Sequence, residues 1–296
     1  MAISKVKVIQ NKQYTQMYNA LTIDVEDYFM VTAFSDVVKT EDWSKYESRV
    51  ENNTLQILDI LDEYRVSATF FTLGWVAEHY PKLVREIHRR GHEVASHGYN
   101  HRLTYDLSLQ EFREDVRRSK ALLEDIIGES IVGYRATSYS ILKKSLWALD
   151  ILIEEGFTYD SSIFPIHHDI YGYPEFSRFP VNIHREGVGD ILEIPISTIN
   201  ILGKNIPIAG GGYLRFFPIR FTEWGIHRLN EKEGKPVIVY IHPWELDPKQ
   251  PRLNGRRLSI FRHYINMETT SSKLRSLLSK FKFGPINKVF HPCTST

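Results

Sequence analysis

Strand-like and helix-like segments alternate through the first 160 residues, and this alternation restricts the possible folds more than any other feature of the chain. Short apolar runs typical of buried strands lie at 19–25, 67–74, 92–98, 131–136 and 157–162. Amphipathic patterns typical of helices separate them, at 53–65, 76–91, 108–127 and 143–156. Repeated strand–helix units of this kind predict a parallel sheet, either closed into a barrel or doubly wound.

Several residues mark where these helices begin. Asn53 is a candidate N-cap of the first helix, and Ser108 with Glu111 forms the S-x-x-E pattern of a capping box. After residue 160 the alternation weakens, and the chain becomes rich in Pro, Gly, His and aromatic residues. A helix, an apolar strand and a final amphipathic helix are then expected near 218–231, 236–242 and 274–283. We expect one domain over residues 1–296, with a core at about 18–245 and a C-terminal extension at about 246–296.

The composition is that of an ordinary globular protein, with 42% hydrophobic and 25% charged residues. A net charge of +1 gives no electrostatic reason to expect nucleic acid or an anionic membrane as a partner. The single cysteine, Cys293, excludes an intrachain disulfide, and its place in a C-terminal tail makes it a poor nucleophile. The N-terminus has no signal-peptide pattern and no apolar run is long enough to cross a membrane, so we expect a cytoplasmic protein.

Polar residues with catalytic potential follow five of the expected strands. They are Asp24, Glu26 and Asp27 after the first strand, His97 and His101 after the third, Arg135 after the fourth, Asp160 after the fifth, and His242 after the strand at 236–242. Each group alone has an ordinary explanation, such as a surface histidine pair, a solvated turn, a structural ion pair, a helix cap or a core histidine. The carboxyl ends of barrel strands meet at one mouth, however, so five such groups together favour a shared site.

These residue types suit metal-assisted hydrolysis of an amide or ester. Two histidines and a carboxylate form a three-ligand site that leaves a position open for water, as in catalytic zinc sites. A second carboxylate can act as general base, and His242 can protonate the leaving group. Arg135 can hold the base ionised, and Asp160 can orient and charge the acid histidine.

The motifs TIDVED, SHGYNH, GYRA, YDSS and VYIHPWE, in this order, resemble those of the polysaccharide deacetylases of carbohydrate esterase family 4. The resemblance extends over about residues 18–283. In the final third, GGGYLRFFP, HPWELDP and FRHYIN resemble the subgroup encoded with bacterial exopolysaccharide loci. The resemblance implies an α/β fold, a deformed, seven-stranded TIM-like (β/α) barrel with an elaborated C-terminal third.

The resemblance also implies a role for each catalytic residue. Asp24 matches the base, Arg135 the arginine that pairs with it, and His242 the acid, with Asp160 as the partner of that acid. Backbone N–H groups near residues 137–139 are expected to bind the oxyanion.

The implied metal site contains one ambiguity. His97 and His101 match the metal histidines, and zinc is the expected ion. The adjacent Asp-Asp pair of the family is opened here, so that the metal carboxylate is either Glu26 or Asp27. Strand alternation favours Glu26, which shares the face of Asp24, whereas a strand ending at Val25 would free Asp27 instead.

Tyr139, Tyr213 and Trp244 are candidates for contact with a sugar, although aromatic residues in such positions are more often part of the core. We expect an enzyme that removes N-acetyl groups from amino sugars of a polysaccharide or its lipid-linked precursor. Its partner would be an N-acetylated glycan or glycolipid. The alternatives are a metal-independent C–N hydrolase of a small cyclic ureide and a non-catalytic sugar-binding module.

Overall fold

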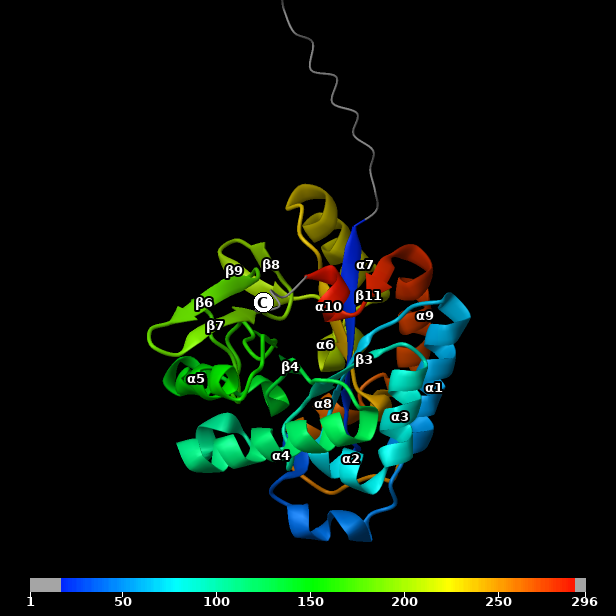
Figure 1. The fold of residues 1–296 in the computed structure, drawn as a ribbon. Helices are drawn as coiled ribbons and strands as arrows, with labels where there is room; N and C mark the ends of the chain where they lie inside the picture. The colour runs from blue at the N-terminus through cyan, green and yellow to red at the C-terminus, as the bar shows by residue number, and fades with distance from the viewer. Residues whose placement is uncertain (1–16, 291–296) are drawn as a thin grey trace, which may run out of the picture.

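The computed structural model describes residues 17–290, and its centre is a twisted sheet of mostly parallel strands (Figure 1). Cys293 and the N-terminal segment 1–16, which carry the expectations about a thiol and a signal peptide, lie outside the described residues. The strands are β1 (Tyr18–Val25), β2 (Thr69–Thr72), β3 (Glu93–Ser96), β4 (Gly133–Tyr134), β5 (Tyr159–Asp160), β6 (Val181–Arg185), β7 (Gly189–Glu193), β8 (Thr198–Ile201), β9 (Lys204–Pro207), β10 (Ile238–Ile241) and β11 (Lys282–Gly284).

The order of the main sheet is β10-β1-β2-β3-β4-β5-β7-β6, and β11 pairs with the start of β1. The seven strands from β10 to β7 in this sheet are parallel to one another, and β6 pairs antiparallel with β7 at the edge. Within residues 17–290, no pairing joins the two ends of the sheet, so the barrel is open. The deformed α/β barrel class with seven parallel strands is confirmed.

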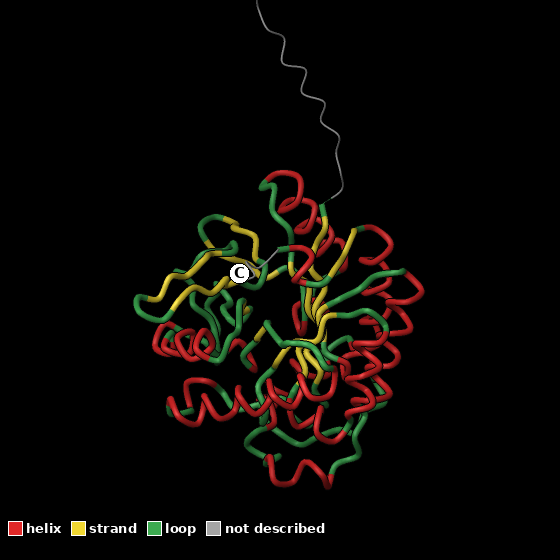
Figure 2. Tube along the Cα trace, in the orientation of Figure 1, coloured by secondary structure: helices red, strands yellow, loops and turns green. Residues whose placement is uncertain are grey.

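Helices follow most strands and cover the outside of the sheet (Figure 2). They are α1 (Val50–Tyr64), α2 (Gly74–His79), α3 (Pro81–Arg89), α4 (Leu109–Ile127), α5 (Trp147–Glu154), α6 (Gly211–Phe216), α7 (Ile219–His227), α8 (Arg257–Tyr264), α9 (Thr270–Lys280) and α10 (Ile286–Val289). The capping box of α4 is confirmed, with both Ser108 and Glu111 hydrogen-bonded to backbone N–H groups. The single helix expected at 76–91 is two helices, because Pro81 cannot continue α2 and begins α3 instead.

The expectation that Asn53 caps the first helix is wrong. Helix α1 begins at Val50, so Asn53 lies inside it and is buried. The free N–H groups at this helix start are taken by Asp27, whose Oδ2 accepts hydrogen bonds from the backbone of Arg49 (2.8 Å) and Val50 (3.0 Å). The cap therefore comes from the end of strand β1, which no local sequence pattern could indicate.

Two β-hairpins, β6–β7 and β8–β9, occupy the region where the sequence showed no regular pattern, and they lie together on the left of Figure 1. The second hairpin turns at Leu202 and Gly203, both with positive φ, as a tight two-residue hairpin turn requires. Strand β7 also pairs in parallel with β5, so the first hairpin completes the main sheet next to Asp160.

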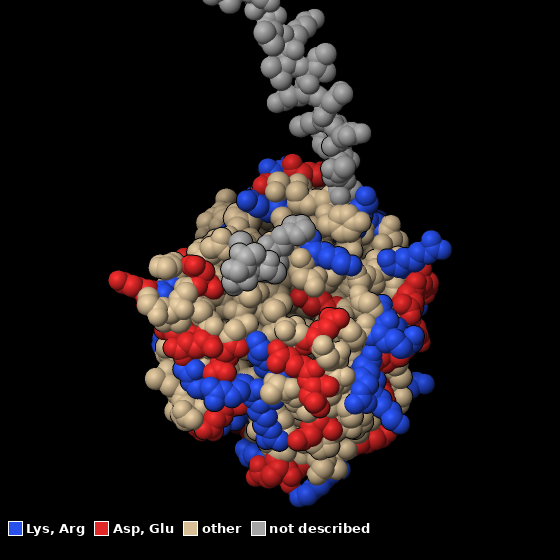
Figure 3. All heavy atoms as spheres, in the orientation of Figure 1, with Lys and Arg blue, Asp and Glu red and all other residues tan. Residues whose placement is uncertain are grey.

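Acidic and basic side chains are interspersed on the face of the molecule that Figure 3 shows, in keeping with the net charge of +1. No helix within the described residues combines the length and apolar character that a membrane crossing requires.

Buried His92 should make the stability of the fold depend on pH. Burial lowers the pKa of His92 to about 4, and its Nδ1 accepts a hydrogen bond from the backbone N–H of Ala68. Between pH 6.5 and pH 4 the unfolded chain binds a proton at this residue and the folded chain does not. The free energy of unfolding should therefore decrease as the pH is lowered. From this residue alone it should be about 2 kcal/mol smaller at pH 5 than well above pH 6.5.

His92→Gln, which retains an acceptor, should lose this part of the pH dependence. Urea unfolding of both proteins at pH 7 and pH 5 measures the difference. An equal drop in the two proteins would show that His92 does not contribute.

Candidate active site

A cavity of about 450 Å³ lies at the carboxyl ends of the parallel strands. Most of the residues singled out in the sequence line it. They are Asp24, Glu26, His97, His101, Tyr139, Tyr213, His242 and Trp244. Three strand ends, those of β1, β3 and β10, thus bring acids and imidazoles from distant parts of the chain into one space, as the βα architecture predicts.

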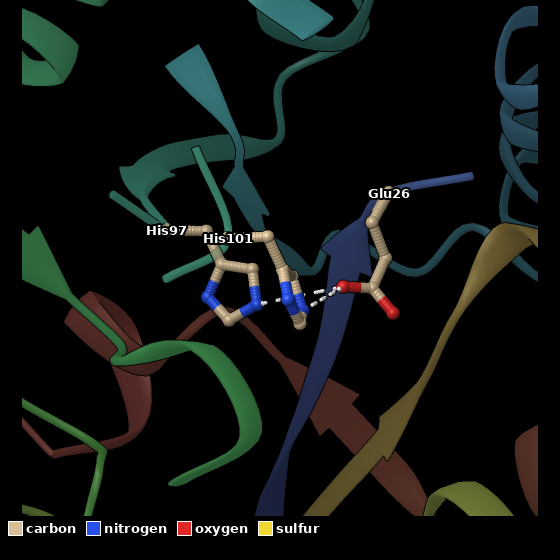
Figure 4. Close-up of side chains that lie close together, drawn as sticks. All are labelled: Glu26, His97 and His101. Carbon is tan, nitrogen blue, oxygen red and sulfur yellow. Dashed lines mark ion pairs between the residues drawn. The ribbon is translucent and has the colours of Figure 1, made fainter. Parts of the chain in front are cut away.

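Glu26, His97 and His101 form a cluster that fits a metal ion, and Figure 4 shows their side chains pointing toward one another. Oε2 of Glu26 lies 2.7 Å from Nε2 of His101 and 4.0 Å from Nε2 of His97. All three side chains are buried, and Oε2 accepts no hydrogen bond of ordinary geometry. A buried carboxylate oxygen without such a partner, facing two imidazoles, has the donor set of a divalent-ion site.

The tautomer of His97 suits the same purpose. Its Nδ1 lies 2.7 Å from the backbone carbonyl of Arg135, which can only accept, so Nδ1 carries the proton. Nε2 then faces Glu26 with its lone pair free. Burial lowers the pKa of His97 to about 4, so the ring is neutral near pH 7, as a metal ligand must be.

The loop that carries the two histidines is held in an unusual conformation. Gly98 has φ +73°, and a Cβ there would lie 2.7 Å from a carboxylate oxygen of Asp115. Asp115, on α4, accepts hydrogen bonds from the backbone N–H groups of Tyr99 (2.8 Å) and Asn100 (3.3 Å). His101 itself has φ +52°, a conformation that costs energy in a non-glycine residue. His97 and His101, four residues apart, are therefore brought together by a loop that Asp115 holds in place, and not by a helix.

Asp27 does not face the histidines. Besides capping α1, its Oδ2 accepts a hydrogen bond from the hydroxyl of Ser48 (2.8 Å), and its Oδ1 accepts one from the backbone of Tyr28 (2.9 Å). As a metal ligand Asp27 is therefore excluded by its position, and the face shared by Asp24 and Glu26 is the one that points into the cavity.

Asp24 is paired with fully buried Arg135. Nη1 of Arg135 donates to Oδ1 of Asp24 at 2.7 Å and to the hydroxyl of Thr22 at 2.8 Å. Its other nitrogens donate to the carbonyl and hydroxyl oxygens of Ser161. Oδ2 of Asp24 lies 3.8 Å from Nε2 of His242. The guanidinium therefore holds the carboxylate of Asp24 in place, next to the imidazole nitrogen that faces the cavity.

His242 has a different carboxylate partner from the one expected. Its Nδ1 lies 2.5 Å from Oε1 of Glu245, and Oε2 of Glu245 accepts a hydrogen bond from Nε of Arg215 at 2.7 Å. Burial alone would lower the pKa of His242, but the hydrogen bond to Glu245 and the charge of Glu26 raise it to about 9. The imidazole is therefore protonated near neutral pH in the absence of a metal.

The expectation that Asp160 is the partner of His242 is wrong. Asp160 is buried behind Arg135, where it accepts a hydrogen bond from the hydroxyl of Ser162 at 2.5 Å and lies beside Glu193. Burial raises the pKa of Asp160 to about 6. Ser162 in turn accepts from the backbone N–H of Ala136 at 2.7 Å, so this group supports the backbone that follows Arg135.

The structure adds two residues that the sequence analysis did not single out, Glu245 and Arg215. Glu245 follows His242-Pro-Trp at the capping-box spacing, and this signal would have located it. Arg215 lies in the motif GGGYLRFFP, which carried the resemblance but implied no role for this residue.

Tyr139 has a buried hydroxyl without a hydrogen-bond partner and a backbone φ of +52°. Among the glycines of the GGG run, Gly210 has φ +111°, and a Cβ there would overlap the ring of Tyr240. These strained positions lie in or beside the cavity wall, which is typical of functional sites.

Comparison with known proteins adds two family matches. Residues 34–152 match the family described as polysaccharide deacetylase, and residues 161–291 match a domain of unknown function, DUF3473. The expected single domain and the exopolysaccharide subgroup stay predictions.

Two curated relatives illustrate the similarity in sequence. The chain is 28% identical over 118 residues to a peptidoglycan deacetylase of Helicobacter pylori, covering 40% of this chain and 39% of that protein. It is 31% identical over 99 residues to a chitooligosaccharide deacetylase of Sinorhizobium fredii, covering 33% and 44%. The matched segments thus span less than half of the length of these two curated relatives.

A crystal structure from Mycobacterium smegmatis that carries the polysaccharide deacetylase name shares the fold, with a TM-score of 0.59 at 23% identity, over 94% of this chain and 92% of that one. The match of residues 34–152 and these relatives thus place this part of the chain with the polysaccharide deacetylases, and the fold of the described residues is similar to that of the solved structure.

Proposed function

We propose that the protein is a metal-dependent hydrolase that removes N-acetyl groups from amino sugars of a polysaccharide or its precursor. The observation that carries this proposal is the presence of three groups in one cavity: the cluster of Glu26, His97 and His101, the carboxylate of Asp24, and the imidazole of His242. Arg135 is paired with Asp24 from outside the cavity lining. Together these groups provide every component that hydrolysis of an amide requires.

Glu26, His97 and His101 would hold the metal ion. Two imidazoles and a carboxylate are typical of catalytic zinc, and we propose zinc as the ion. When bound, such an ion supplies a Lewis acid that lowers the pKa of water and polarises the acyl oxygen.

Asp24 and His242 would move the protons. Asp24 accepts a proton from the attacking water, and Arg135 orients its carboxylate for this purpose through a hydrogen bond to Oδ1. His242 donates a proton from Nε2 to the amine nitrogen as the carbon–nitrogen bond breaks. The base and the acid lie close enough, 3.8 Å apart, to act on one acyl group.

The wall of the cavity suggests how a sugar is held. Tyr213 and Trp244 line the cavity. Phe216 and Phe261 also line it, and both are more than half exposed to solvent. Aromatic side chains around a few polar groups are typical of small-molecule sites. Relatives named for peptidoglycan and chitooligosaccharides favour a glycan of N-acetylglucosamine type as substrate. A lipid-linked precursor and a cytoplasmic location remain narrower predictions.

Release of acetate from N-acetylglucosamine oligomers and from peptidoglycan tests the proposal. We expect release that stops after the protein is treated with a chelator and returns when zinc is added. Release that survives complete removal of metal would favour a metal-independent C–N hydrolase. Tight glycan binding without any acetate release would favour a sugar-binding module.

A further inference from the structure

The cavity is lined by residues of two separately matched parts of the chain, together with Asp24 and Glu26, which precede both parts. His97, His101 and Arg135 lie within residues 34–152, the segment matched to the polysaccharide deacetylases. His242 lies within residues 161–291, the segment matched to the domain of unknown function. Both segments contribute strands to one sheet, so their side chains meet at the same edge.

We propose that the segment 161–291 supplies the proton-donating side of the active site, in which Glu245 and Arg215 act as positioning residues for His242. This inference rests on the proposed function, because it concerns the leaving-group step of the same reaction. It gives the domain of unknown function a defined task within the enzyme.

Glu245 fixes which nitrogen of His242 faces the substrate. Oε1 of Glu245 receives both the backbone N–H of His242 at 3.1 Å and the ring Nδ1 at 2.5 Å. The turn Pro243–Leu246 closes this short loop, so the carboxylate is tied to the residue that it orients. With Nδ1–H bound to Glu245, Nε2 points toward Asp24 and the cavity.

Arg215 holds Glu245 from the opposite side. Its Nε donates to Oε2 of Glu245, and its Nη1 donates to the backbone carbonyls of His263 (2.5 Å) and Ile265 (3.2 Å). Arg215 and Glu245 are 2% and 0% exposed, so neither charge is screened by solvent and each requires the other.

Trp244 restrains the imidazole plane. Its ring stacks on His242, with centroids 5.1 Å apart, and on His263, with centroids 4.1 Å apart. The acid histidine is thus fixed by one hydrogen bond, one stacking contact and a buried ion pair, and all of these come from residues 161–291. Asp160, the carboxylate expected for this role, accepts a hydrogen bond from Ser162 instead.

The leaving-group step offers a test that separates positioning from general damage. In amide hydrolysis the water oxygen first bonds to the acyl carbon and its proton passes to Asp24. The carbon–nitrogen bond of the tetrahedral adduct then breaks as the amine nitrogen takes a proton from His242. In an aryl acetate ester the phenolate leaves without needing that proton. A defect in the acid therefore slows the amide far more than the ester.

Glu245→Gln should lower kcat for N-acetylglucosamine oligomers by at least ~100-fold with little change in KM, and lower hydrolysis of 4-nitrophenyl acetate by less than ~10-fold. Arg215→Lys should also slow the amide more than the ester, but by a smaller factor. This variant replaces Glu245→Gln in the experiment if Glu245→Gln does not fold. Glu193→Gln is the matched control, since Glu193 is equally buried but lies outside the cavity. Any loss in this variant should be equal for the two substrates.

Equal losses on amide and ester in Glu245→Gln, or no loss on either, would overturn the positioning role. A wild-type protein that releases acetate from no N-acetylated glycan, with zinc present, would instead overturn the proposed function. The two failures are therefore distinguishable.

Discussion

Glu26→Gln is expected to abolish metal binding, whereas Asp27→Asn, one residue further along, is expected to retain it. Oε2 of Glu26 lies between the two imidazoles, and an amide in its place offers no charged ligand. Changes in residues behind metal ligands already cost 10–100-fold in affinity, so loss of the ligand itself should cost more than about 100-fold. Zinc content after dialysis and acetate release measure the two effects.

Asp27→Asn serves as the control because its carboxylate has a different task. Its oxygens accept hydrogen bonds from the backbone at the start of α1, so the variant should unfold with about 1–2 kcal/mol less free energy while its metal content stays normal. The reverse result, in which Asp27→Asn loses the metal and Glu26→Gln keeps it, would contradict the cluster of Glu26, His97 and His101.

The positions of most site residues followed from a single physical rule. Parallel strands joined by helices end at the same edge of the sheet, so polar residues after successive strands must approach one another. This rule located Asp24, His97 and His242 at the cavity, and Arg135 against Asp24, without any knowledge of the insertions between them. Alternation along β1 was also enough to favour Glu26 over Asp27, because side chains two apart on a strand share a face.

The same rule could not locate the partner of His242. It predicts at which edge of the sheet a residue lies. It does not predict how deeply the side chain is buried or toward which face of the sheet it points. Asp160 pairs across strands with Glu193 on β7, and the two carboxylates lie together beneath Arg135. Strand β7 belongs to a hairpin in the turn-rich segment that showed no regular pattern, so this pairing was invisible in the sequence.

Arg215 illustrates a second limit. It lies in the six-residue helix α6, which begins within the glycine run after a hairpin. The motif GGGYLRFFP contains Arg215 but implied no role for it, and no periodicity marks its position. Its importance arises only when α6, the turn after β10 and the segment after α8 come together around Glu245. Contacts among three irregular segments depend on tertiary packing, which local patterns do not encode.

Asp24→Asn should retain the metal ion and lose turnover by about 10²–10⁴-fold, the usual contribution of a general base. Because the attacking water must lose a proton whatever the leaving group, the loss should be similar for the N-acetylated oligomer and for 4-nitrophenyl acetate. This pattern differs from that of Glu245→Gln, where the ester is largely spared.

The fold should tolerate the Asp24→Asn change, since Arg135 keeps three hydrogen bonds to Thr22 and Ser161. Zinc content checks that the site is intact, and the ratio of the two rates identifies the defect. A variant that hydrolyses the ester at the wild-type rate while losing the amide would place Asp24 on the leaving-group side. In that case His242, 3.8 Å away, would have to serve as the base, and the assignment of the two residues would be reversed.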